Sequence, residues 1–203
     1  MSVIQVLGLA LGAAWTSGLN LYATIAVLGL LQHYKLAHLP GGLHVLDNRL
    51  IIGVAIFLYV VEFFADKIPY VDTVWDALHT FIRVPAGAVL AATATVDISP
   101  TVQVLALLLG GGLALSTHGT KATVRAGANL SPEPLSNWAL SLLEDVLAIG
   151  AVVLAVIYPI GIFVVILIFL LLLVWILPKV LRRIRRMLKA AGDFFRGRAL
   201  EAR

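Results

Sequence analysis

The sequence predicts an all-α protein that crosses a membrane about six times. Of its 203 residues, 61% are hydrophobic and 13% are charged, and the mean hydropathy is +1.00. A soluble domain carries about 25% charged residues, so the composition indicates that lipid is the main solvent of this chain. The second observation is a series of apolar runs close to the length of about 20 residues that a helix needs to cross a bilayer.

Six apolar segments reach or approach that length. The clearest covers residues 160–177, where the indole of Trp175 is the only polar side-chain group. The third segment is the least regular, because it is short, begins next to Pro85 and is rich in alanine. The predicted spans cover residues 3–31, 50–65, 84–96, 101–128, 138–158 and 160–177.

A seventh helix is predicted at the membrane boundary, at residues 70–83. Asp72, Asp76, His79 and Arg83 recur at helical spacing and share one face, while apolar residues occupy the other face. A helix with one charged and one apolar face lies flat at the membrane surface. We therefore predict one interfacial helix before the third span.

The charges are unevenly placed along the chain. Residues 179–203 hold nine lysine and arginine residues against two acidic residues, whereas residues 1–178 hold six basic and nine acidic residues. A basic segment beside a membrane helix marks the cytoplasmic side and binds anionic lipid, so nucleic-acid binding is not expected. With six spans, both termini are predicted to be cytoplasmic, together with loops 66–83 and 119–137.

The first and fourth predicted spans are too long for one straight crossing. Small polar residues interrupt both, at Thr16, Ser17 and Gly18 in the first and at Thr117 and Gly119 in the fourth. Discontinuous helices of this kind expose backbone groups near the centre of many transporters. We predict that the helices are broken within residues 16–20 and 117–121, around these small polar residues.

An internal similarity suggests a repeated structure. The stretch "AAWTSGLNLYAT" (13–24) resembles "ALSTHGTKATVR" (114–125), and Glu62 aligns with Glu144 further along. Three spans in each half would make the halves enter the membrane from opposite sides, which is the inverted-repeat plan of many transporters. The predicted organisation is one transmembrane domain (1–178) of two inverted three-helix repeats (1–98 and 99–178), followed by a basic amphipathic tail (179–203).

Three stretches also resemble a known family. They are "TSGLNLYATIAVLGLL", "EFFADKIPYVDTVWDALHTFIRVPAGA" and "HGTKATVRAGANLSPEP", and they are similar to a bacterial family of small integral membrane proteins catalogued as a domain of unknown function. The resemblance covers residues 10–160. It implies a multi-span protein of the bacterial cytoplasmic (inner) membrane, and it implies no particular activity.

The candidate site consists of polar residues at membrane depth, where ionisable groups mark a pathway, a proton relay or a buried ion pair. Glu62 and Asp66 lie one helical turn apart, as do Lys121 and Arg125. Histidine titrates near neutral pH, and His118 lies beside these cations. The predicted substrate- or ion-binding residues are Asn20, Glu62, Asp66, His118, Lys121, Arg125, Asn129 and Glu144.

Transport or permeation of a small charged solute, an ion or a lipid headgroup is the favoured function, with the carboxylates coupling it to protons. The alternative is a non-catalytic membrane scaffold or accessory subunit, in which Glu62 or Asp66 pairs with Arg125 and Glu144 pairs with Lys121. An intramembrane lipid-modifying enzyme ranks third. The sequence contains no catalytic motif for such chemistry, so we do not expect an enzyme.

Few partners are implied beyond the membrane itself. The chain has no cysteine, and the spacing of His33, His38 and His44 matches no standard ligand pattern, so neither a metal nor another cofactor is expected. Membrane lipids, with anionic lipid at the tail, and a small ion or solute are the predicted partners. Alanine- and glycine-rich faces at residues 86–94 and 110–114 are also typical of homo-oligomers.

Overall fold

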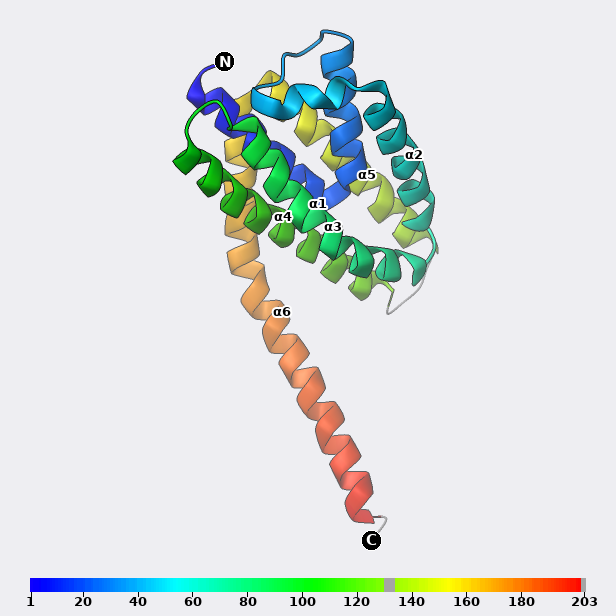
Figure 1. Ribbon diagram of the computed structural model, residues 1–203. Coiled ribbons are helices and arrows are strands. Elements are labelled where there is room, and N and C mark those ends of the chain that lie inside the picture. Colours follow the sequence, from blue (N-terminus) through cyan, green and yellow to red (C-terminus); the bar gives the residue numbers. More distant parts are fainter. Residues whose placement is uncertain (130–133, 202–203) are drawn as a thin grey trace. The chain divides into compact units, whose positions relative to one another are not determined.

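Helices are the only regular secondary structure in the described part of the chain. The computed structural model describes the backbone of residues 1–129 and 134–201 (Figure 1). Five of its helices are long and apolar enough to cross a membrane, and η1 and α2, which meet at an angle of 77°, would make a sixth candidate. The all-α polytopic fold class is therefore confirmed. In chain order the helices are α1 (Val3–His33), η1 (Gly41–Asp47), α2 (Arg49–Ala65), α3 (Val71–Ala94), α4 (Pro100–Ala128), α5 (Pro134–Ile157) and α6 (Pro159–Glu201).

Local signals in the sequence explain where three of these helices begin. Ser2 and Gln5 form a capping box at the start of α1, each side chain bonded to the backbone of the other residue. Asn48 caps α2 by accepting from the backbone of Leu50, and Ser99 caps α4 immediately before Pro100. These side chains satisfy backbone N–H groups that have no partner in the first turn of a helix.

Helix α1 is broken at Asn20, which has φ −149° and ψ 102°. The side chain of Asn20 accepts a hydrogen bond from the backbone of Ala23 (2.9 Å) and so caps the second half of the helix. The predicted break in the first helix therefore exists and lies at Asn20, the last residue of the predicted range, while Thr16, Ser17 and Gly18 stay helical. The hydroxyls of Thr16 and Ser17 donate to carbonyls of their own helix, so they leave its backbone bonds intact.

The break returns α1 to the end of the bundle from which it started. Figure 1 shows its two halves as a V whose arms rise to the same edge. Met1, near the start of α1, lines one cavity together with Leu36 and His38, which follow its end. The N-terminus therefore lies at the other end of the first unit from loop 66–83, which corrects the predicted arrangement, whereas the membrane crossing by residues 3–31 and the side on which each terminus lies stay predictions. By length and composition alone α1 is still a candidate span.

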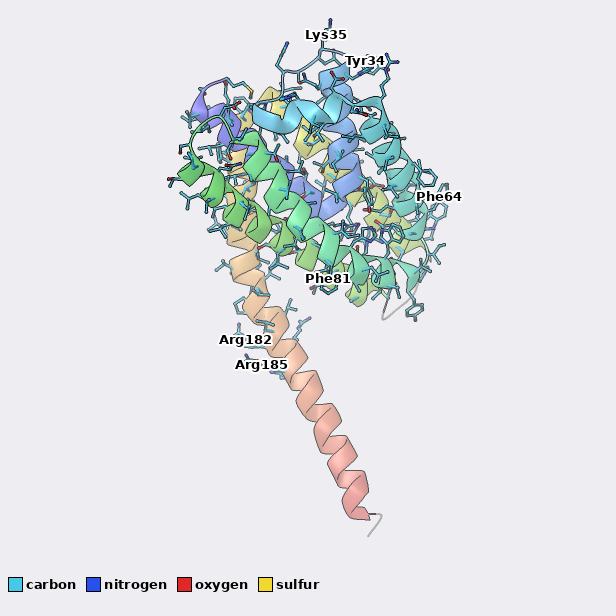
Figure 2. All side chains as sticks on the ribbon, viewed as in Figure 1. Tyr34, Lys35, Phe64, Phe81, Arg182 and Arg185 are labelled. Atoms are coloured by element: carbon cyan, nitrogen blue, oxygen red, sulfur yellow. The ribbon has the colours of Figure 1, made fainter. Side chains whose placement is uncertain are left out.

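Helix α3 is one continuous helix that joins the predicted interfacial helix to the predicted third span. Pro85 lies inside it. The face with Asp72, Asp76, His79 and Arg83 is buried, and apolar residues such as Phe81 are exposed on the opposite side (Figure 2). The interfacial prediction is therefore wrong, because charges on neighbouring helices replace water as partners of the polar face.

Helix α4 has no break, so the predicted interruption at Thr117 and Gly119 is wrong as well. The hydroxyls of Ser116, Thr117, Thr120 and Thr123 each donate to the carbonyl four residues earlier, at 2.6 to 2.8 Å. Small polar residues in α4 thus bond to the helix itself and do not interrupt it. Because the first helix of one predicted half is bent and that of the other is straight, the inverted repeat gains no support and stays a prediction.

Glycine and alanine let α1, α3 and α4 approach closely. A Cβ atom at Gly87 would lie 2.5 Å from Ala114 Cβ and 2.8 Å from Ser17 Oγ, and one at Gly110 would lie 2.6 Å from Ala91 Cβ. Small residues are the usual contact between membrane helices, since packing rather than the hydrophobic effect drives their association. These parts of the alanine- and glycine-rich runs are therefore used inside the chain, and the predicted homo-oligomer stays a prediction.

The chain divides into two units, Met1–Val164 and Val165–Arg203. The second unit is a continuation of α6, where the ammonium of Lys179 lies 2.9 Å from the ring centre of Trp175 and Arg182 Nε donates to Pro178 O. The predicted apolar side of the tail falls largely on side chains outside the described ones. The predicted boundary at residue 178 differs from this division and remains untested.

Candidate functional site

Ten charged side chains come together at one end of the first unit, and all are buried, with at most 8% of any of these residues exposed. They lie on α2 and in the connection after it, on α3, on α4 and on α5, in the parts of these helices nearest to the end where α2 and α4 finish and α3 and α5 begin (Figure 1). We call this group the charged cluster: Glu62, Asp66, Lys67, Asp72, Asp76, Arg83, Lys121, Arg125, Glu144 and Asp145.

Lys121 links four carboxylates to the break in α1. Its Nζ lies 2.8 Å from Asp66 Oδ2, and carboxylate oxygens of Glu62, Asp76 and Glu144 lie at 3.5 to 3.8 Å. The same Nζ donates to the backbone carbonyl of Leu19 at 3.2 Å. This carbonyl belongs to the last turn before the break, so the cation also neutralises the negative end of the first half of α1.

Arg125 joins the connection after α2 to α5. Its guanidinium donates to Asp66 Oδ2 (3.1 Å), to the Asp66 carbonyl (2.6 Å) and to both oxygens of Glu144. Asp72 Oδ2 lies 3.6 Å from Arg125 Nη1, and Asn129 Nδ2 donates to Asp72 Oδ1 at 2.8 Å. A buried guanidinium with several oxygen partners fixes their positions by its planar geometry.

Arg83 binds Glu62 and Asp76 and determines the protonation of His118. It donates to Glu62 Oε1 (2.7 Å), Asp76 Oδ1 (3.3 Å) and His118 Nδ1 (3.0 Å). A guanidinium can only donate, so His118 Nδ1 carries no proton, and Nε2–H donates towards Thr80 Oγ1 and the Asp76 carbonyl. A proton added to Nδ1 would face the guanidinium, so this geometry does not support the predicted role of His118 as a group that titrates near neutral pH.

The broken α1 touches the cluster through Asn20. Asn20 Nδ2 donates to Asp145 Oδ1 at 3.1 Å, while its Oδ1 caps the second half of α1. Non-helical backbone at membrane depth is tolerated where it is buried in protein or lines a water-filled cavity. Among the described residues Asp145 forms no ion pair within 4 Å, and its Oδ2 is buried without a hydrogen-bond partner.

His79 lies beside the cluster and contacts Trp75 and Tyr22. His79 Nδ1 lies 2.8 Å from the Trp75 carbonyl, which only accepts, so this nitrogen is the donor and Nε2 is free to accept from the hydroxyl of Tyr22 at 3.0 Å. The rings of Trp75 and His79 stack with centroids 4.3 Å apart. Tyr22 thus connects the broken helix to α3, as Asn20 connects it to α5.

The cluster contains more carboxylates than cations, six against four. Within the described part of the chain, five buried carboxylate oxygens of the cluster have no hydrogen-bond partner: Glu62 Oε2, Asp66 Oδ1, Asp72 Oδ2, Asp76 Oδ2 and Asp145 Oδ2. Leaving a buried carboxylate oxygen without a hydrogen-bond partner costs free energy. The cluster therefore has hydrogen-bond acceptors that its own cations do not use.

Two members of the cluster lie in the connection between α2 and α3, outside the helices. Burial by itself raises the pKa of Asp66, but the charges of Lys121 and Arg125 outweigh burial and hold this pKa below its ordinary value of 3.8. Burial lowers the pKa of Lys67 below its ordinary value of 10.5, although the charges of Asp145 and Asp66 act in the opposite direction. Asp66 is thus held ionised by its partners, whereas Lys67 is less well compensated.

All eight predicted binding residues lie in this region. Glu62, Asp66, Lys121, Arg125 and Glu144 belong to the cluster, and Asn20, His118 and Asn129 donate to or accept from its members. Their role in binding a solute or ion stays a prediction. Of the ion pairs considered, Asp66 pairs with Arg125 and Glu144 approaches Lys121 at 3.5 Å, while Glu62 pairs with Arg83 and not with Arg125.

Five members of the cluster are absent from the residues that the sequence predicts for the site: Asp72, Asp76 and Arg83 on α3, Lys67 in the connection after α2, and Asp145 on α5. The helical spacing of the three α3 residues predicts that they share one face, but the same spacing fits a face at the membrane surface. The signal that would have found them is the continuity of the apolar pattern from residue 71 to residue 94, which makes α3 long enough to carry this face into the bundle.

Histidines at the other end of the unit bind nearby groups. His33 Nδ1 lies 2.6 Å from Asp47 Oδ1, and His44 Nδ1 lies 2.6 Å from the Gly41 carbonyl. Within the described part of the chain, no group of three or more His, Asp or Glu side chains is arranged to hold a metal ion.

Comparison with known proteins gives one match. The model of the family described as "Domain of unknown function (DUF4126)" matches residues 7–179, which includes every residue of the charged cluster and leaves most of the basic tail outside. No curated protein and no solved structure matches the chain. The resemblance drawn from the sequence is confirmed.

Proposed function

We propose that this chain, which belongs to the family described as "Domain of unknown function (DUF4126)", is a membrane transport protein that moves a small charged solute together with protons. One observation carries the proposal: the break of α1 contacts a buried cluster that has more carboxylates than cations. We place the protein in the bacterial cytoplasmic membrane, as the resemblance implied.

The proposed mechanism couples proton binding to the shape of α1. Asp145 is the proton-exchanging group, since it has no cation within 4 Å among the described residues and bonds directly to the residue at the break. An ionised carboxylate accepts a hydrogen bond about twice as strongly as a neutral group does. Protonation of Asp145 therefore weakens its hold on Asn20, which lets the two halves of α1 change their angle, as discontinuous helices do in transporters.

Proton movement in proteoliposomes tests this proposal. A potassium gradient with valinomycin would make the lumen negative, and an enclosed pH-sensitive dye would report acidification. We expect the wild-type protein to acidify the lumen faster than empty liposomes do, and Asp145→Asn to abolish the difference. Asp97→Asn is the matched control, because Asp97 is exposed in the loop between α3 and α4. Rates equal to those of empty liposomes at either polarity of the potential would refute proton transport.

A second candidate, the membrane scaffold or accessory subunit, is favoured by a different observation. Arg83, Lys121 and Arg125 already have carboxylate partners within 4 Å. Four cavities of about 300 to 510 Å³ lie elsewhere in the described structure. Three of them have no cluster residue in their lining, and the fourth has Lys67 alone. For a scaffold, Asp145→Asn would change stability while no proton flux is seen with either protein.

A further inference from the structure

A groove runs along the outside of the first unit between the end of α2 and the start of α5. It has a volume of about 390 Å³ and is lined by Phe63, Phe64, Lys67, Ile68, Trp138 and Leu142. Phe64 and Trp138 are 62% and 52% exposed, and Figure 2 shows Phe64 pointing outward. Lys67 is thus the only charged side chain in an otherwise apolar and aromatic groove.

Lys67 differs from the other three cations of the charged cluster. Its ammonium donates to two neutral oxygens, the Phe63 carbonyl (3.0 Å) and Ser141 Oγ (3.1 Å), and lies 3.0 Å from the ring centre of Phe63. Among the described residues it has no carboxylate within 4 Å, whereas Arg83, Lys121 and Arg125 each have at least two. A buried positive charge therefore borders the groove without a close counter-charge.

The protonation of Lys67 points in the same direction. Burial lowers the pKa of this lysine, so its charged form is less stable here than in water. An anion placed in the groove would offset that loss, because the low-dielectric surroundings strengthen its attraction to the ammonium.

The position of the groove matches the depth of lipid headgroups. Lys67 lies in the connection after α2 and Trp138 near the beginning of α5, so both are at the end of the bundle. Lysine and tryptophan are typical of the membrane–water boundary, and basic pockets between membrane helices bind anionic headgroups. Phe64 and Leu142 continue the groove along α2 and α5, where an acyl chain would lie.

We propose that this groove is a binding site for an anionic phospholipid, with the phosphate at Lys67 and an acyl chain against Phe64, Trp138 and Leu142. The site is independent of the proposed transport function, since the cluster residues that contact α1 take no part in it. The lipid replaces the missing counter-charge of Lys67 and covers the gap between α2 and α5, which Lys67 and Ser141 bridge by a hydrogen bond.

Fluorescence of Trp138 tests the site directly. The chain has four tryptophans, and the full-length variant W15F/W75F/W175F keeps only the one in the groove. Nanodiscs would contain phosphatidylcholine with an equal fraction of either brominated phosphatidylglycerol or brominated phosphatidylcholine, because bromine quenches a nearby indole. We expect the anionic lipid to be preferred at Trp138 about fivefold, the factor that one lysine gives near an anionic surface.

Matched variants separate this site from general attraction to the basic tail. K67Q in the same background should reduce the preference to about one, on the scale of that single lysine, whereas K35Q should leave it unchanged because Lys35 is exposed in the loop after α1 (Figure 2). Equal quenching by both lipids, or a preference that survives K67Q, would overturn the proposal.

Native mass spectrometry of the protein with its own tryptophans provides a second measurement that does not depend on the triple variant. After extraction in a mild detergent with added phosphatidylglycerol, the wild-type chain and K35Q should each retain one more lipid than K67Q retains. The same number of bound lipids on all three proteins would contradict a site at Lys67.

Discussion

Asn20 on α1 donates a hydrogen bond from Nδ2 to Oδ1 of Asp145 on α5, over 3.1 Å, and 125 positions separate these two residues in the chain. The same asparagine accepts from the backbone of Ala23 and caps the second half of α1. One side chain thus stabilises the break in α1 and attaches it to the charged cluster. This relationship makes Asn20 the residue where a change of charge in the cluster would act on the backbone.

Replacing Asn20 should therefore destabilise the protein more than the loss of an ordinary helix cap. Asn20→Ala removes a cap worth about 1 kcal/mol and a hydrogen bond to a charged group worth about 1.5–3 kcal/mol. Asn48→Ala is the control, because exposed Asn48 caps α2 without touching the cluster. Thermal unfolding in detergent should show the larger loss for Asn20→Ala, and equal losses would mean that the contact with Asp145 contributes nothing.

Removing one partner of a buried ion pair should cost more than removing both. Arg125→Gln leaves Glu144 without its closest cation and removes one of the two cations of Asp66, so it should destabilise the protein by about 3–5 kcal/mol. The double variant R125Q/E144Q should recover part of that loss, since it also removes an uncompensated carboxylate. Arg49→Gln, at an exposed position, should stay within about 0.5 kcal/mol of wild type. If the stability losses of Arg125→Gln and Glu144→Gln, measured separately by denaturant unfolding, add up to the loss of the double variant, Arg125 and Glu144 are not coupled.

Acid should remove the stabilisation that Asp66 provides. Because Lys121 and Arg125 hold the pKa of Asp66 below 3.8, its contribution is complete above the pKa of the unfolded chain and is lost as the pH falls through the folded value. Asp66→Asn should therefore be less stable than wild type at pH 7, and this difference should shrink as the pH falls below about 4, near the ordinary pKa of aspartate. Unfolding midpoints measured from pH 7 to pH 3 give this comparison, with Asp97→Asn as the control. A difference that stays constant over this range would contradict the assigned charge state.

The close approach of α1, α3 and α4 should tolerate no added methyl group at Gly87. Gly87→Ala forces a Cβ against Ala114 and Ser17, and overpacking of this kind costs about 1–3 kcal/mol. Gly112→Ala makes the same chemical change in α4 where the new Cβ meets no atom within 4 Å, so it should be neutral or stabilise by up to about 1 kcal/mol. The thermal unfolding midpoint of Gly87→Ala should therefore fall, while that of Gly112→Ala should stay unchanged or rise.

Basic residues in predicted loops were a poor guide to orientation in this chain. Lys67, Arg83, Lys121 and Arg125 fall within the predicted loops 66–83 and 119–137, but all four are buried in the charged cluster. The positive-inside rule applies to charges that stay in water near the ends of a span. The cytoplasmic placement of the C-terminus therefore stays a prediction that rests on the basic tail.

The candidate site was predictable to a considerable extent because of the cost of burying polar groups. Glu62, Lys121 and Glu144 stand in apolar surroundings in the sequence, and lipid leaves such groups few partners other than each other. The contribution of α3 was not predictable in the same way. Its charged face fits a solvated surface as well as a buried one, and only the partners on α2 and α4 distinguish the two.

By itself, the amino-acid sequence determined that this is a helical membrane protein, because a chain with so little charge must satisfy its backbone hydrogen bonds internally, and helices do so within each segment. The tertiary structure alone decided that α1 turns back at Asn20 while α4 continues through Thr117 and Gly119. The small polar residues of both helices can bond to their own helix. A helix breaks where distant groups, here Lys121 and Asp145, bind the backbone and the side chain that the break exposes.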